Sequence, residues 1–82
     1  MAQKIPNPKL MDMICDVLQV YDEPMTFYEI KRVLQSRHGH ETIHNMVEDV
    51  LIALRVDLVK AGRVTWSTNG NIVLYQAAKG VN

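Results

Sequence analysis

Several features are scarce in this 82-residue chain, which has one cysteine, one tryptophan, one phenylalanine and no net charge. A single cysteine excludes an intrachain disulfide and fits a reducing compartment. Nine Lys and Arg residues balance nine Asp and Glu residues, which argues against indiscriminate binding to polyanions or to an anionic membrane surface. No apolar run approaches the roughly 20 residues that a bilayer-spanning helix needs. We therefore expect an intracellular protein, cytoplasmic or associated with the nucleoid, with no membrane contact.

The remaining composition is that of an ordinary globular domain, with 48% apolar and 22% charged residues. A chain of this length forms one domain. We predict a flexible lead-in over residues 1–8, a folded domain over residues 9–76 and a frayed tail over residues 77–82. A core of this size is marginal, and association with another copy is a common remedy.

The first predicted helix covers residues 9–21. Asn7 supplies a capping oxygen, and Pro8 suits the first helical position because proline loses no donor that is needed there. The apolar residues in this helix recur at helical spacing: Leu10, Met11, Ile14, Val17, Leu18 and Tyr21. Cys15 lies within this stretch, so we expect a buried thiol rather than a reactive one.

Two further helices are predicted over residues 27–37 and 43–61. The first begins with a capping box formed by Thr26 and Glu29, in which each side chain accepts a hydrogen bond from the other residue's backbone N–H. Gly39 ends it. The second helix is capped by Thr42 and is ended by Gly62. Its apolar residues fall on one face: Ile43, Met46, Val47, Val50, Leu51, Leu54 and Leu58.

The last part of the chain predicts a β-hairpin. Its two arms are rich in β-branched and aromatic residues, and Asn69-Gly70 between them is the strongest short hairpin signal. A two-residue loop at this dipeptide places Val64 opposite Tyr75, Trp66 opposite Val73 and Thr68 opposite Asn71. The first two pairs share a face, which we expect to cover the helices.

The order of these elements resembles the winged helix-turn-helix superfamily over about residues 9–76. The segments EPMTFYEI, LVKAGRVTW and STNGNIVLY look like the short strand and second helix, the end of the third helix, and the wing of these domains. The resemblance implies an α+β fold of three helices followed by a C-terminal two-stranded β-hairpin wing.

The resemblance also implies DNA binding by a small transcriptional regulator. In such domains the third helix reads the major groove, and the wing and second helix hold phosphates. Carried onto this chain, the reading positions are Thr42, His44 and Asn45, with His38 and His40 in the preceding turn; these residue types hydrogen-bond base edges or phosphates. The expected phosphate contacts are Lys31, Arg32, Arg37, Arg63, Thr68, Asn69 and Asn71. Against this stand Glu41, Glu48 and Asp49, because carboxylates repel phosphate.

Metal binding and catalysis are not expected. His38, His40 and His44, with Glu48 beyond them, have plausible ligand spacing, but the cluster has no cysteine. Exposure to solvent, or a response to pH near neutrality, are the alternatives for these histidines. The chain has no glycine-rich phosphate loop, nucleophile elbow or paired-carboxylate spacing. We therefore expect no enzyme activity, no cofactor and no small-molecule ligand.

Apolar residues also occur away from the expected core faces. They are Met13 and Val20 on the first helix and Ile52, Val56 and Val59 on the third. Either other elements cover these residues or they form the interface of a homodimer, which would suit a palindromic DNA site. The alternative to DNA binding is a winged-helix protein–protein interaction module that uses this apolar surface.

The zero net charge is a sum of segregated blocks. Residues 24–40 carry three cations and one anion, and residues 58–82 carry three cations and no anion. Residues 41–57, which contain most of the third helix, carry one cation and four anions. The pattern permits a basic edge on the second helix and wing, but the acidic third helix argues against reading DNA with that helix.

Overall fold

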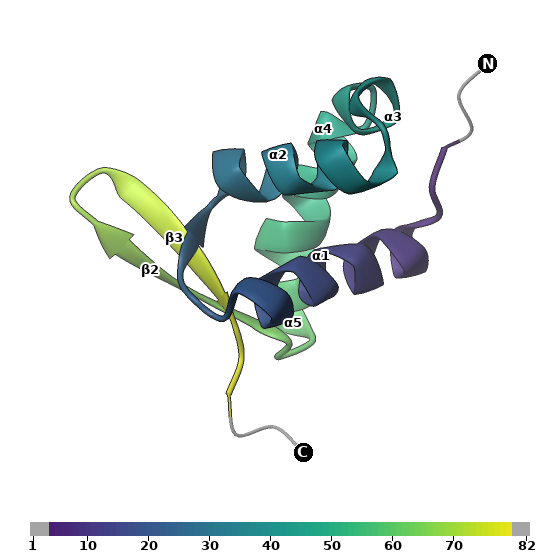
Figure 1. The fold of residues 1–82 in the computed structure, drawn as a ribbon. Coiled ribbons are helices and arrows are strands. Elements are labelled where there is room, and N and C mark those ends of the chain that lie inside the picture. Colours follow the sequence, from purple (N-terminus) through teal and green to yellow (C-terminus); the bar gives the residue numbers. More distant parts are fainter. Residues whose placement is uncertain (1–3, 80–82) are drawn as a thin grey trace.

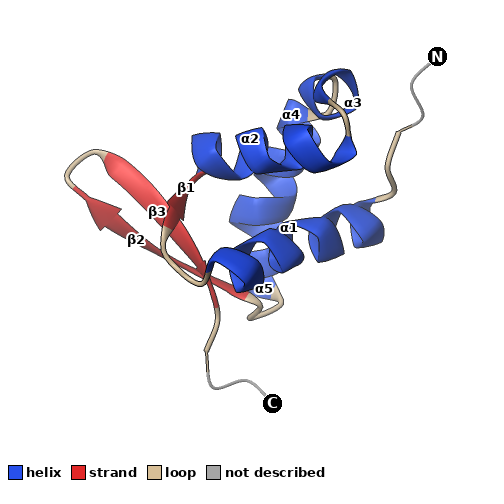
Figure 2. Ribbon diagram, viewed as in Figure 1, coloured by secondary structure: helices blue, strands red, loops and turns tan. Residues whose placement is uncertain are grey.

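The computed structural model describes residues 4–79 and has an α+β architecture, in which a helical body is followed by a small antiparallel sheet (Figures 1 and 2). The sheet has three strands in the order β1-β3-β2, so the predicted two-stranded wing gains a third strand. The elements are α1 (Asn7–Tyr21), β1 (Met25–Thr26), α2 (Phe27–His38), α3 (His40–His44), α4 (Val47–Ile52), η1 (Ala53–Asp57), α5 (Leu58–Lys60), β2 (Val64–Asn69) and β3 (Ile72–Ala77).

Helix α1 begins two residues earlier than predicted. Pro6 occupies the N-cap position, and the Asn7 side chain does not cap the helix. Instead, Asn7 Nδ2 donates a hydrogen bond to Asp57 Oδ2 at 3.1 Å. At the other end of the chain, Ala77 lies in β3 rather than in a tail. The predicted lead-in and tail otherwise include residues 1–3 and 80–82, which lie outside the described residues.

The capping box at the start of α2 is confirmed. The Glu29 backbone N–H donates to Thr26 Oγ1 at 3.1 Å, and the Thr26 backbone N–H donates to Glu29 Oε1 at 2.9 Å. The helix ends at His38, one residue beyond the prediction. Gly39 follows with φ of 102°, a conformation that side chains disfavour and glycine accepts.

The predicted helix over residues 43–61 is wrong as a single element. A short helix, α3, precedes a turn at residues 45–46, and the long helix starts only at Val47. Thr42 lies inside α3 and caps nothing, because Gly39 occupies the N-cap of α3. Met46, with φ of −118° and ψ of 20°, interrupts the helix, and its side chain is buried in the core. What we call the long helix consists of α4, η1 and α5 in succession, and η1 is a π-helical turn within it.

The hairpin pairs in a different register from the predicted one. Gly70 and Asn71 form the loop, and Asn69 pairs with Ile72. Within the hairpin, positive φ occurs only at Gly70, which is the first loop position, as in a II′ turn. Trp66 consequently pairs with Tyr75 and Val64 with Ala77. A shift of two residues preserves which side chains share a face, so the predicted faces hold although the partners change.

The core lies where α1, α2, the long helix and the base of the sheet meet. Helix α1 packs against α2, η1 and β3, so it is buried on more than one side. The fully buried large side chains are Leu10, Ile14, Val17, Leu18, Ile30, Leu34, Ile43, Val50, Leu54 and Leu58. Over residues 4–79, no helix is both long and apolar enough to cross a bilayer.

Candidate functional site

An exposed apolar surface joins the long helix to the hairpin. Two adjoining hollows define it, one of about 230 Å³ beside α4 and η1 and one of about 190 Å³ between η1 and the hairpin, and Arg55 lines both. We call this the helix–hairpin surface, and its residues are Leu51, Ile52, Arg55, Val56, Trp66, Val73 and Tyr75. The hairpin projects from the helical body (Figure 1), which leaves the inner face of its outer half uncovered.

The exposure of this surface is high for its residue types. Ile52 is 53% exposed, Val56 47% and Trp66 57%. Val73 adds 38%, whereas Tyr75, at the base of the hairpin, is buried. Contiguous exposed apolar side chains on a small domain mark interaction sites more often than isolated ones do. The helix–hairpin surface is therefore the leading candidate for the working face of the molecule.

The π-helical turn explains which predicted interface residues belong to this surface. At 100° per residue, Ile52, Val56 and Val59 share one face of an uninterrupted α-helix. A π turn holds one additional residue and rotates the residues after it by about 100°. Val59 is consequently half-buried against the core, while Ile52 and Val56 remain exposed.

The predicted interface role of Met13 is wrong, because this side chain is 9% exposed and belongs to the core. Its burial results from the position of α1 between α2, η1 and β3. Val20 is 61% exposed on α1, but it lines neither hollow of the helix–hairpin surface. Of the five predicted interface residues, the structure brings only Ile52 and Val56 together on an exposed face.

The residues predicted to read DNA do not lie on the long helix. Thr42 and His44 are in α3, and Asn45 is in the turn after it. The first turn of the long helix instead carries Glu48 and Asp49. His38, His40, His44 and Asn45 are exposed, and the His40 and His44 rings stack with their centroids 6.0 Å apart. Across residues 4–79, no three His, Cys, Asp or Glu side chains are grouped to hold a metal ion.

The predicted phosphate contacts fall into two groups. Arg37 and Arg63 form ion pairs with Asp16 at 2.7 Å and Asp12 at 3.0 Å, respectively, which offsets their charge. Lys31 and Arg32 lie beside the exposed Tyr28 ring, 5.0 and 6.0 Å from its centroid. The remaining three, Thr68, Asn69 and Asn71, are exposed around the end of the hairpin.

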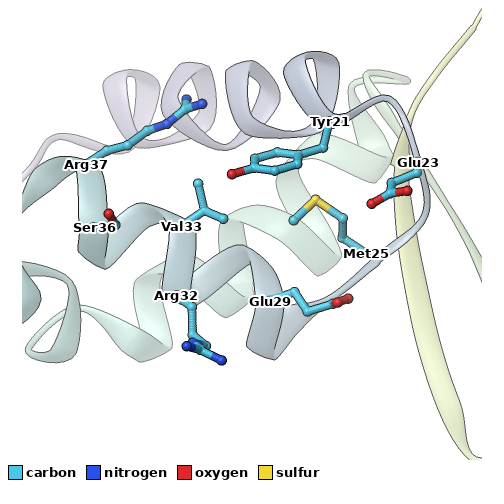
Figure 3. Close-up of a pocket in the computed structure, with 8 residues that line it drawn as sticks. All are labelled: Tyr21, Glu23, Met25, Glu29, Arg32, Val33, Ser36 and Arg37. Carbon is cyan, nitrogen blue, oxygen red and sulfur yellow. The ribbon is translucent and has the colours of Figure 1, made fainter.

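A further hollow, of about 440 Å³, is a groove between the end of α1 and α2, which we call the α1–α2 groove. Figure 3 shows Tyr21 and Arg37 reaching into it, with Arg32 directed away from α1. Two of its polar groups serve the fold, since Arg37 pairs with Asp16 and Glu29 completes the capping box. Met25 is buried and Val33 is half-buried, so the α1–α2 groove exposes fewer apolar side chains than the helix–hairpin surface does.

Cys15 is buried in α1, as predicted. Burial raises the pKa of its thiol above the ordinary value of 9.0, and Asp12 adds to this rise while Arg63 opposes it. A thiol with a raised pKa is protonated at neutral pH and is a poor nucleophile. Cys15 is therefore a packing residue in this fold.

Comparison with models of protein families, with curated proteins and with solved structures finds no match to this chain. The evidence for the candidate site is therefore the geometry of this structure. Sequence reasoning missed Arg55, Trp66 and Val73 as members of the exposed surface. The alternation of side chains along the hairpin places Trp66 and Val73 on one face of the sheet. It does not indicate how far that face extends beyond the helices.

Proposed function

We propose that this chain is a winged-helix-type protein–protein interaction module whose working face is the helix–hairpin surface. The observation that carries the proposal is a group of exposed apolar side chains on two elements. Ile52 and Val56 lie on the long helix, and Trp66 and Val73 lie on the hairpin. Interfaces favour such apolar and aromatic residues at their centre, together with arginine. Arg55, between the two hollows, supplies that arginine.

The chemistry of the partner can be inferred from the charges on the same helix. Glu48 lies on the exposed side of α4, and Arg55 lies on the surface itself. The fitting partner is a folded protein with an apolar centre, a cation to meet Glu48 and an anion to meet Arg55. Such complementary charges steer association and fix its orientation.

Duplex DNA fits this surface poorly. In the winged-helix arrangement the third helix and wing are the usual DNA contacts. Here the face that they share, the helix–hairpin surface, carries mainly apolar residues and one arginine, with Glu48 beside it. Cations supply most of the affinity for phosphates, and two of the predicted cations, Arg37 and Arg63, are paired with carboxylates. DNA binding by the edge that carries Lys31, Arg32 and the histidines stays a prediction, and it is a separate outcome of the test.

A photoreactive amino acid at position 52, in cells that make the protein, tests the proposal. We expect it to crosslink to one partner protein, whereas position 72 should not. Ile72 is a matched control because it is 54% exposed and lies on the opposite face of the hairpin from Val73. With the purified partner, Ile52→Asp should weaken binding about tenfold or more, and Ile72→Asp should change it little.

Three results contradict the proposal. The first is equal crosslinking from positions 52 and 72. The second is binding to the captured protein that Ile52→Asp leaves unchanged. The third is salt-sensitive binding of the chain to mixed-sequence duplex DNA, measured by fluorescence anisotropy. If Lys31→Ala and Arg32→Ala abolish that binding while Ile52→Asp does not, the DNA-binding hypothesis replaces the docking one.

A further inference from the structure

We infer that the partner of the helix–hairpin surface is a second copy of this chain, bound with the two long helices antiparallel. This inference rests on the proposed function and names its partner. Glu48 lies four residues before Ile52 in α4, about one helical turn along the same face, and Arg55 of η1 lines the same hollow as Ile52. An apolar residue is thus flanked by an anion on one side and a cation on the other.

This stripe is complementary to itself when it is reversed. A twofold axis near Ile52 makes an isologous contact, in which the same surface of both copies forms the interface. Ile52 then lies against Ile52 of the second copy, and Glu48 lies opposite Arg55 of the second copy. The axis generates two such Glu–Arg pairs, one at each end of the apolar centre.

Both charged side chains are available for this pairing. Within residues 4–79, neither Glu48 nor Arg55 takes part in an ion pair. Most other carboxylates of α1 and α4 are already engaged: Asp12 with Arg63, Asp16 with Arg37 and Asp49 with Lys4. A charge that the fold leaves unpaired beside an exposed apolar residue is suited to an intermolecular ion pair.

The opposite orientation is disfavoured by the same charges. In a parallel pair of long helices, Glu48 faces Glu48 of the second copy and Arg55 faces Arg55, and juxtaposed like charges oppose association. Trp66 and Val73 extend the apolar contact beside the helix. The small core adds a reason for association, because covering Ile52 and Val56 increases the apolar area that each copy buries.

Charge reversal tests the antiparallel pairing by sedimentation equilibrium over a range of protein concentrations. We expect the wild-type chain to dimerise, and Glu48→Arg and Arg55→Glu each to raise the dimer dissociation constant about tenfold or more. Mixing the two variants should restore association, because the heterodimer regains opposite-charge pairing. The double variant, in which the charges are exchanged, should also dimerise. Glu41→Arg and Arg32→Glu, which reverse exposed charges away from the surface, are the matched controls.

Every outcome decides the inference. It is overturned if the wild-type chain stays monomeric at high concentration, if either reversal leaves the dimer intact, or if the mixture fails to associate. Circular dichroism of each variant separates a lost interface from a lost fold. A monomeric wild-type chain whose position 52 crosslinks to a different protein rejects the second copy but keeps the proposed function. A dimer that both reversals leave intact overturns the inference, because it shows that Glu48 and Arg55 do not pair across the interface, and crosslinking from position 52 then tests the proposed function separately.

Discussion

The α1–α2 groove and the helix–hairpin surface are both hollowed, but they differ in what their side chains already do. The larger hollow, the α1–α2 groove, is lined by Met25 of the core and by Arg37 and Glu29, whose polar groups hold the fold together. The helix–hairpin surface exposes Ile52 and Trp66, which the fold leaves uncovered. The difference teaches that exposed apolar side chains with no role in the fold, rather than volume, identify a candidate site.

The largest expected effect is at a residue of the α1–α2 groove, and this comparison would be wrong if that residue were dispensable for folding. Met25 is 5% exposed in β1, and Met25→Ala should lower the free energy of unfolding by about 2–5 kcal/mol, because truncation leaves a cavity. Ile52→Ala should change it by only about 0.5 kcal/mol in dilute, monomeric protein. Urea unfolding measures both values, and equal losses would mean that Ile52 belongs to the core.

A smaller effect is expected at the capping box beside the groove. Thr26→Ala removes the acceptor for the Glu29 backbone N–H, which should cost about 0.5–2 kcal/mol of stability. Thr26→Ser keeps an oxygen at this position and should retain most of it. Thermal unfolding compares the stability of the wild type and the two variants. A serine variant as unstable as the alanine variant would show that the methyl group of Thr26 contributes more to stability than its hydroxyl group does.

The smallest effect is expected at the ion pair that closes one side of the groove. Arg37→Ala removes the contact with Asp16, a carboxylate whose side chain is 64% exposed. Exposed pairs of this kind contribute about 0.2–1 kcal/mol, and salt weakens them. Unfolding at low and high salt should show a difference between wild type and variant that shrinks with salt. A difference that persists at high salt would instead indicate lost packing of the arginine stem.

Local signals predicted much of the fold. The capping box at Thr26 and Glu29 and the glycine after α2 set the bounds of that helix to within one residue, because the interactions involved span only a few residues. The long helix was predicted wrongly because Ile43 and Met46 lie three residues apart and also fit one face of a continuous helix. Their spacing therefore did not reveal the turn between α3 and α4. The hairpin register moved by two residues because Gly70, rather than Asn69, takes positive φ.

The candidate site was predictable only in part. Periodicity found Ile52 and Val56, but it also selected Val59, because a constant 100° per residue cannot anticipate a π turn. It selected Met13 because the number of elements packed around α1 is a property of the tertiary fold. Trp66 was expected to cover the helices, yet the hairpin extends past them and leaves it 57% exposed. No local pattern encodes how far a hairpin projects.

Strand β1 has only two residues, so the sheet has a rigid three-stranded base and a more flexible two-stranded end. Only Leu74 and Tyr75 of β3 have a neighbour on both sides, from β1 and β2. Beyond them the hairpin is a two-stranded ribbon, which twists more readily than a wider sheet and opens locally at lower free energy. Trp66 pairs with Tyr75 at the boundary between these parts. The base of the hairpin is therefore fixed to the core, while its outer half can change its twist to fit a protein that binds beside it.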